Sequence, residues 1–187
     1  MSAIATAAKA PARAGVTLVE MMITLAVMAV LGAIAMPSLS ALAARQRLQS
    51  AAHQLQADVA LAKLESAKHG MAVYLRFQPG AAWCWHLTTG PGGDCQQPAA
   101  GQAHGVLRVV RAADHPGIDL LEASTIAVDL SRPGSLPGPQ AAGQALFASR
   151  EGFQLRVRVG PQARASLCSV GLPINGTQAC PADLPGR

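Results

Sequence analysis

The sequence predicts an α+β fold in which one long N-terminal helix, membrane-spanning in its first half, packs on an antiparallel β-sheet or small β-sandwich. Residues 21–44 carry no formal charge, and as a helix they are long enough to cross a hydrocarbon core of roughly 30 Å. A helical pattern with one apolar stripe continues to residue 69. After Gly70 the pattern changes to short runs of β-forming residues separated by Gly and Pro.

The second half of the predicted helix is amphipathic. Its apolar residues recur at spacings of three and four, which places them on one face that can pack on a head; they are Leu48, Ala52, Leu55, Val59 and Ala62. Lys68 and His69 suit the negative end of the helix dipole, and Gly70 suits its C-cap. Pro37 lacks a backbone N–H and crowds the preceding turn, so we expect a kink or local melting of the helix there.

The segment 70–187 is expected to form the β-rich head. Its short strand-like runs are 71–77, 83–88, 106–111, 125–130, 145–148, 153–159 and 165–170. Residues 155–159 alternate most cleanly, with apolar side chains on one face and arginines on the other. The Pro- and Gly-containing segments 90–93 and 132–143 are predicted to be exposed turns.

Four cysteines, all beyond the apolar run, indicate disulfides formed in an oxidising compartment. Four cysteines allow three pairings. We favour Cys84 with Cys95 and Cys168 with Cys180, because each pair brackets a short loop that contains Gly or Pro. A zinc site is the competing interpretation, but no two of the cysteines form a Cys-x-x-Cys motif. We expect no metal and no cofactor.

Length and composition favour one compact domain with a membrane appendage. The 187 residues are 50% hydrophobic but only 3% aromatic and 13% charged, so Ala, Leu and Val supply most of the apolar content. The formal net charge is +5, and a leader ending at Gly15 would remove Lys9 and Arg13 and lower it to +3. Such mild basicity gives little support to nucleic-acid binding.

Residues 14–20 read Ala-Gly-Val-Thr-Leu-Val-Glu, immediately before the uncharged run. Glu20 is unexpected there, because an unpaired carboxylate in a bilayer costs on the order of several kcal/mol. This motif resembles the processing site of type IV pilins and type II secretion pseudopilins. The resemblance implies that a prepilin peptidase cuts after Gly15 and methylates the new amino terminus of Val16. It also implies that Glu20 pairs with the amino terminus of a neighbouring subunit in a filament.

The resemblance divides the chain into a leader (1–15), an N-terminal helix (16–69, with 16–44 for membrane insertion and assembly) and a periplasmic head (70–187). Pro37 stands where the family commonly carries a proline at which the helix loosens in a filament. Residues 43–52 and 61–70 are similar to the GspH/FimT group of minor pilins and pseudopilins. The resemblance implies a pilin-like fold, a single inner-membrane span, and other pilins, the prepilin peptidase and membrane lipid as partners.

That group implies a minor pilin, a structural subunit that acts in type IV pilus assembly. A minor pseudopilin of type II secretion is the alternative, and the paired cysteines favour the pilus. An ordinary secretory signal peptide is a further alternative, because Ala41-Leu42-Ala43 could be cut by a common signal peptidase. The uncharged run is longer than the usual apolar region of such peptides, about 7–15 residues. Glu20 could also simply lie in the headgroup layer.

The sequence contains no catalytic constellation. Its five histidines are scattered, and no Gly-x-Ser-x-Gly, His-Glu-x-x-His or phosphate-binding loop occurs, so we expect no enzyme. Trp83 and Trp85 flank Cys84, and we expect one Trp to cover the disulfide and the other to be half exposed.

Arg156, Arg158 and Arg164 are candidate DNA contacts, and a DNA-binding minor pilin of natural transformation is the third hypothesis. Some FimT-type members, by resemblance, bind DNA through a Gly-Arg-x-Arg element near the C-terminus. The matching segment here, 160–164, reads Gly-Pro-Gln-Ala-Arg and departs from that element. Phosphate binding normally needs several cations together, so DNA binding is not favoured.

Overall fold

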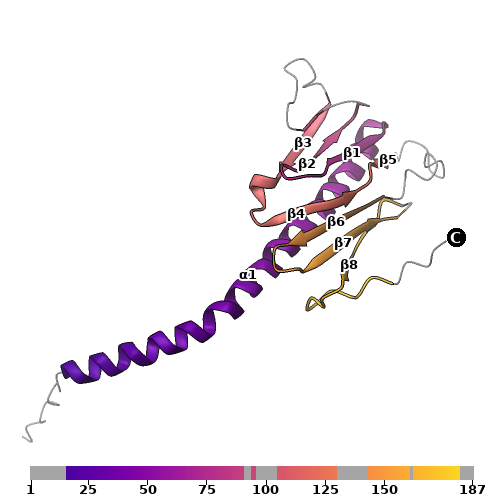
Figure 1. Cartoon of the computed structure of the whole chain (residues 1–187). Coiled ribbons are helices and arrows are strands. Elements are labelled where there is room, and N and C mark those ends of the chain that lie inside the picture. Colours follow the sequence, from indigo (N-terminus) through magenta and orange to yellow (C-terminus); the bar gives the residue numbers. More distant parts are fainter. Residues whose placement is uncertain (1–15, 91–93, 96–104, 130–142, 161, 182–187) are drawn as a thin grey trace, which may run out of the picture. The chain divides into compact units, whose positions relative to one another are not determined.

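The structure is a computed structural model that describes residues 16–90, 94–95, 105–129, 143–160 and 162–181, with the backbone alone for residues 35–37. Helix α1 covers Leu18–His69 (Figure 1). It ends at the residue that the sequence predicts and begins two residues after the predicted start. The chain divides into two units, Met1–Ser40 and Ala41–Arg187, and α1 contributes to both.

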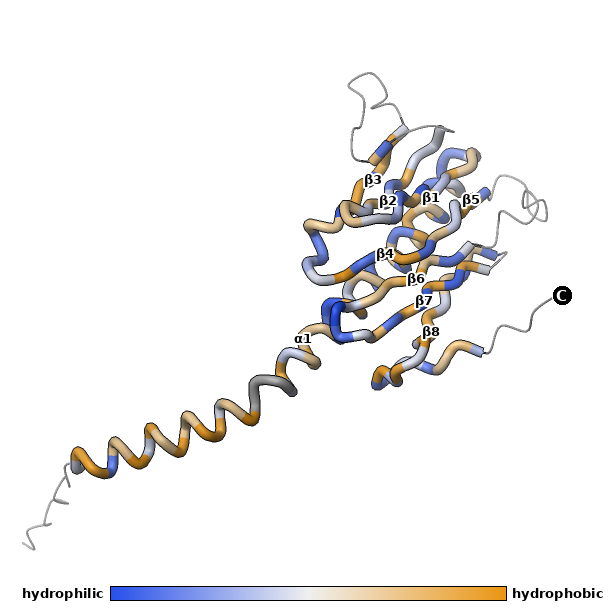
Figure 2. Tube along the Cα trace, viewed as in Figure 1, coloured by the Kyte–Doolittle hydropathy of each residue, from blue (hydrophilic) through white to orange (hydrophobic). Residues whose placement is uncertain are grey.

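In the first unit, α1 presents apolar side chains to its surroundings. Figure 2 shows this part of the tube as mainly hydrophobic, and every residue from 16 to 34 except Gly32 is exposed. Within the described residues, no one straight helix has both the length and the apolar character that a membrane span needs. The two parts of α1 on either side of residues 35–37, Leu18–Ile34 and Ser38–His69, meet this need together, by length and composition only. The side chain of Pro37, where a kink is expected, lies outside the described residues.

The second unit contains two four-stranded antiparallel sheets, which together with α1 confirm the predicted α+β fold. Sheet A has the order β3-β2-β1-β5, with β1 (Val73–Gln78), β2 (Cys84–Thr88), β3 (Val106–Arg111) and β5 (Ile126–Val128). Sheet B has the order β4-β6-β7-β8, with β4 (Ile118–Ala123), β6 (Gly143–Ser149), β7 (Gln154–Val159) and β8 (Ala165–Val170). A short 3-10 helix, η1 (Ala112–Asp114), leads from sheet A to sheet B.

Strand β4 is missing from the strands predicted from the sequence. Ile118 and Leu120 are buried and Asp119 between them is exposed, which is the alternation of a half-buried strand. The register then shifts between Leu120 and Glu122, so Leu121 and Glu122 are both exposed and the alternation ends there. A β-bulge of this kind breaks the two-residue alternation of apolar and polar residues by which a strand is predicted from sequence.

The chain passes from sheet B to sheet A between β4 and β5, and the crossing point is tightly packed. The backbone N–H of Ser124 donates to the carbonyl of Gln144 over 2.9 Å. Beside this bond, a Cβ added at Gly143 would lie 2.3 Å from Cγ1 of Ile126. Gly143 is therefore required by the close approach of the two strands.

The core of the second unit lies among α1 and the inner faces of both sheets. The apolar stripe predicted for the helix is confirmed, because all five of its members are at most 1% exposed. Side chains from the two sheets complete this core, among them Leu75, Leu87, Ile126, Phe147, Leu155 and Val157. Each such side chain contributes about 1.5–3 kcal/mol when fully buried, so the helix is held mainly by this stripe.

The two tryptophans are placed differently from the expectation. Trp83 and Trp85 are both at most 1% exposed, and their rings stack with centroids 5.4 Å apart. The expectation that one of them is half exposed is wrong, because residues two apart on an extended chain point to the same face. Both rings therefore enter the core, where Phe147 meets each of them edge-on.

Both disulfides favoured from the sequence are present. Cys84 pairs with Cys95, and Cys168 pairs with Cys180. The second bridge ties the segment after β8 back to that strand, where Ser169 and Ala179 form a parallel bridge. Closing loops of this length contributes about 2–4 kcal/mol each in the chain-entropy account.

Candidate functional site

The beginning of α1 is built by Thr17 and Glu20. The backbone N–H of Glu20 donates to Oγ1 of Thr17 over 3.2 Å, and the N–H of Met21 donates to the carbonyl of Thr17 over 3.2 Å. Thr17 is therefore the N-cap residue, and Glu20 stands at the third helical position, as in a Thr-x-x-Glu capping pattern. This capping role is not among the predictions made from the sequence, although the spacing of Thr17 and Glu20 indicates it.

The carboxylate of Glu20 belongs to an exposed residue on an otherwise apolar helical surface. Large apolar side chains surround it on α1, including Leu18 (76% exposed) and Met21 (56% exposed). An acid in the first turn is favourable next to the positive end of the helix dipole. In an apolar environment the same carboxylate would require a cation or an amine as partner.

The expected processing site adjoins this turn. Gly15 lies outside the described residues, and Val16 is 66% exposed. If the chain is cut after Gly15, the new amine lies two residues from the start of α1 and adds positive charge to the positive end of the helix. A carboxylate near that amine offsets this unfavourable charge.

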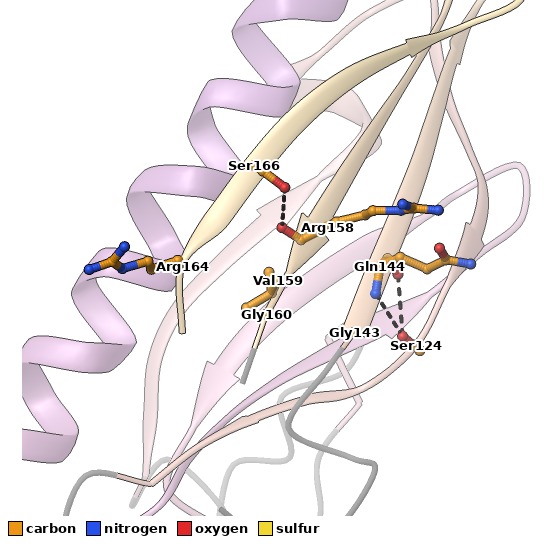
Figure 3. Close-up of a pocket in the computed structure, with 8 residues that line it drawn as sticks. All are labelled: Ser124, Gly143, Gln144, Arg158, Val159, Gly160, Arg164 and Ser166. Carbon is orange, nitrogen blue, oxygen red and sulfur yellow. Dashed lines mark hydrogen bonds between the residues drawn. The ribbon is translucent and has the colours of Figure 1, made fainter. Parts of the chain in front are cut away.

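The candidate DNA-binding arginines do not converge. Arg156 and Arg158 lie on the outer face of β7, alternating with the buried Leu155, Val157 and Val159. Arg164 lies in the turn after β7 and is exposed. Figure 3 shows that the side chain of Arg158 extends towards Gln144, whereas that of Arg164 extends the opposite way, towards α1. The two guanidinium groups therefore do not face one phosphate in this structure.

Arg158 and Arg164 border an open groove of about 700 Å³ at one end of sheet B. Its two serine hydroxyls bond to backbone groups: Oγ of Ser124 accepts from the N–H of Gln144 over 2.9 Å, and Oγ of Ser166 donates to the carbonyl of Arg158 over 3.3 Å. The described lining residues include no carboxylate, histidine or cysteine. The groove can offer guanidinium and amide groups to a ligand, but its described lining has no base beside either serine.

A buried carboxylate links α1 to sheet A. Asp58 is fully buried, accepts a 2.7 Å hydrogen bond from Nε1 of Trp85, and lies 3.3 Å from Nε of Arg108 through its other oxygen. The contact with Arg108 is an ion pair without hydrogen-bond geometry. Burial raises the pKa of Asp58, although the Trp85 hydrogen bond and the Arg108 charge act to lower it. Asp58 directly precedes the stripe residue Val59, and a charged residue at the edge of an apolar stripe is the sequence feature that indicates such a buried contact.

Two histidines are buried in the head. His115 stacks against Trp83 and Trp85, with 6.2 Å between ring centroids in each pair, and burial lowers its pKa. His86, on β2, has no hydrogen-bond partner for either ring nitrogen among the described residues. Burial lowers the pKa of His86, the charge of Arg76 lowers it further, and Asp94 opposes both. No group of three or more potential metal ligands occurs in the described part of the chain.

Comparison with known proteins identifies the N-terminal segment. A family model described as the prokaryotic N-terminal methylation motif matches residues 11–36, which include Gly15, Val16 and Glu20. The chain therefore carries the processing signal of type IV pilins and pseudopilins, consistent with a membrane-anchored subunit that a prepilin peptidase processes and that assembles with other pilins. No curated protein and no solved structure gives a significant match to the chain.

Proposed function

We propose that the chain is a non-enzymatic minor subunit of a type IV pilus or a related filament. The precursor enters the bacterial inner membrane through residues 16–44, and its head folds in the periplasm. A prepilin peptidase cuts after Gly15 and methylates Val16. The mature subunit then leaves the bilayer and assembles with other pilins through its apolar helix.

The observation that carries this proposal is the position of Glu20 within the matched motif. It is an exposed acid in the first turn of a helix whose other exposed residues are mainly apolar. In a filament its carboxylate pairs with the amino terminus of a neighbour, so that two charges that are costly alone compensate each other. Packing of the apolar surface supplies attraction, and the charge pair sets the register.

The head supports an exported location. Its two disulfides suit an oxidising compartment such as the periplasm. Its interior is a packed apolar core that contains the stacked rings of Trp83 and Trp85, as expected of a structural module. The head is proposed to present surfaces to neighbouring subunits rather than to catalyse a reaction.

The test is the intact mass and amino-terminal sequence of the mature chain extracted from membranes, with and without reduction and alkylation. The proposal expects a start at Val16, a mass increase of one methyl group, and no free thiol before reduction. A start at Ala44 would indicate an ordinary signal peptidase. In that case the assembly role of Glu20 would be refuted.

A minor pseudopilin of type II secretion is the alternative, since the same helix would serve a short secretion filament. Deletion of the gene separates the two: loss of twitching motility or natural transformation with intact secretion supports the pilus. Loss of secretion alone supports the pseudopilin.

DNA binding by Arg156, Arg158 and Arg164 is the third candidate and is not favoured, because Arg158 and Arg164 point in opposite directions (Figure 3). This third candidate function requires that the purified chain bind DNA. The affinity for DNA must then fall with added salt and with neutralisation of Arg156 and Arg158.

A further inference from the structure

The first two charges after the uncharged run belong to Arg45 and Arg47, and the head holds Arg45 in place. The guanidinium carbon of Arg45 lies 4.4 Å from the centroid of the Phe153 ring, a cation–π distance. Its buried Nε has no hydrogen-bond partner among the described residues. Arg47, two residues further on, is exposed. The Phe153 ring thus fixes the direction of the Arg45 guanidinium, and only the parts of that group beyond the buried Nε can face a ligand.

The turn that supplies Phe153 joins β6 to β7 and is itself well fixed. The N–H of Ser149 donates to the carbonyl of Phe153 over 2.8 Å, and the N–H of Phe153 approaches Oγ of Ser149 at 3.3 Å. Arg150 and Glu151 occupy the exposed tip, where their charges offset each other. Arg45, held over Phe153, and the exposed Arg47 add two positive charges near this turn.

The opposite end of sheet B lies far along the helix. There the amine of Lys63 donates to the carbonyl of Gln162 in the turn between β7 and β8. Lys63 is 18 residues beyond Arg45, a separation of roughly 27 Å along an α-helix. Arg164, in the same distal turn, is an exposed arginine remote from Arg45.

Chain connectivity places the Arg45 end of the head beside the membrane segment. Arg45 directly follows Ala44, the last residue of the uncharged run 21–44, and consecutive Cα atoms are 3.8 Å apart. Ala44 is buried in the head, so the membrane part of the run is at most residues 21–43. Residues 21–40 already span roughly 30 Å as a helix, and if they occupy the hydrocarbon core, Arg45 and Arg47 follow within about 11 Å along the chain, at the level of the lipid headgroups.

We propose that Arg45 and Arg47 bind the phosphate groups of anionic phospholipids, whose headgroups carry no compensating cation, in the outer leaflet of the inner membrane, and so dock this end of the head on the bilayer before assembly. A guanidinium presents paired donors that match phosphate oxygens, and Phe153 aims one of the two. This inference rests on the proposed membrane insertion. It assigns to the head a lipid contact that must break when the subunit enters a filament.

The test uses the full chain reconstituted in nanodiscs of phosphatidylcholine and phosphatidylglycerol in equal parts. Native mass spectrometry of the released chain gives the ratio of retained phosphatidylglycerol to phosphatidylcholine. One arginine near an anionic lipid surface changes binding about fivefold, so Arg45→Gln and Arg47→Gln are each expected to lower this ratio about fivefold. Arg164→Gln, the same change at the distal end, should leave it unchanged.

Three outcomes would overturn the inference: no preference for phosphatidylglycerol in the unaltered chain, a preference that survives both substitutions, or an equal loss in Arg164→Gln. Because Arg45→Gln also removes the contact with Phe153, the exposed Arg47 provides the variant that does not disturb the core. Failure of the chain to enter nanodiscs would refute the proposed membrane insertion instead, so the two failures are distinguishable.

Discussion

The indole Nε1 of Trp85 donates a 2.7 Å hydrogen bond to Oδ2 of Asp58, which ties the inner strand β2 to the second half of α1. Both side chains are fully buried. The ion pair of Asp58 with Arg108 reaches towards solvent, because the Arg108 side chain is 45% exposed. The hydrogen bond is therefore the stronger link between helix and sheet.

Replacing Asp58 by Leu is expected to destabilise the head by about 1–3 kcal/mol, because it leaves the Trp85 N–H buried without an acceptor. Asp58→Asn keeps an oxygen for Trp85 and removes only the charge, so its effect should be much smaller. Thermal unfolding of the detergent-solubilised chain, followed by near-ultraviolet circular dichroism, measures both. If the Asn variant is as unstable as the Leu variant, the charge pair with Arg108 is the main link.

Asp58 should also make the head more stable in acid. Because burial raises its pKa above 3.8, the folded state binds the proton more tightly than the unfolded state. This contribution to the stability of the head is fully present below pH 3.8, and it is lost as the pH rises through the raised pKa of Asp58 in the folded state. The free energy of unfolding of the unaltered chain should fall as the pH rises through this range. In Asp58→Asn it should depend less on pH. An identical profile in the two proteins would contradict the assignment.

His86 should have the opposite effect. Its pKa is lowered from 6.5, so the unfolded state takes up a proton first, and stability is lost as the pH falls from 6.5 through the folded pKa. His86→Leu should remove part of this loss, whereas His53→Leu, on the exposed face of α1, should not. The measurement is the free energy of unfolding on both sides of pH 6.5. An equal change in the two variants would show that the buried position of His86 is not the cause.

Gly143→Ala is expected to destabilise the head by about 1–3 kcal/mol through overpacking. The added methyl group would lie 2.3 Å from Cγ1 of Ile126, at the crossing between the sheets. Gly160→Ala is the matched control, because its nearest neighbour, the carbonyl oxygen of Arg164, would be 3.9 Å away. Denaturant unfolding of both variants compares them. Equal stabilities would mean that β5 shifts to accommodate the methyl group at no cost.

Glu20→Ala is expected to leave the head folded and the chain in the membrane, yet to exclude it from sheared filaments. The bond from residue 20 to Oγ1 of Thr17 uses the backbone N–H, so the substitution retains the helix cap and removes only the charge. Glu151→Ala, an exposed acid of the head, is the control and should assemble normally. Immunoblots of sheared and membrane fractions give the result. Normal assembly of Glu20→Ala would remove charge pairing from the mechanism.

Features that depend on local pattern were readable from the sequence. The stripe from Leu48 to Ala62 follows directly from helical periodicity, because one face of a helix repeats every three to four residues. The two disulfides close short loops that contain Gly or Pro, and this local feature favoured the observed pairs. The processing motif is contiguous, and its match to residues 11–36 needs no fold.

Features that depend on contacts between distant segments required the tertiary structure. Strand β4 is interrupted by a bulge at Leu121. The bulge can be recognised only from the pairing of β4 with β6. Asp58 is tolerated in the core because Trp85, from a strand distant in the sequence, supplies a donor.

The sequence by itself determined the leader motif, the amphipathic stripe of the long helix and the α+β class, because each is encoded by neighbouring residues. Only the tertiary structure decided that Arg158 and Arg164 point apart and that Phe153 holds Arg45. Such relationships depend on how strands far apart in the chain are paired. That pairing results from the packing of the whole core, which local periodicity does not specify.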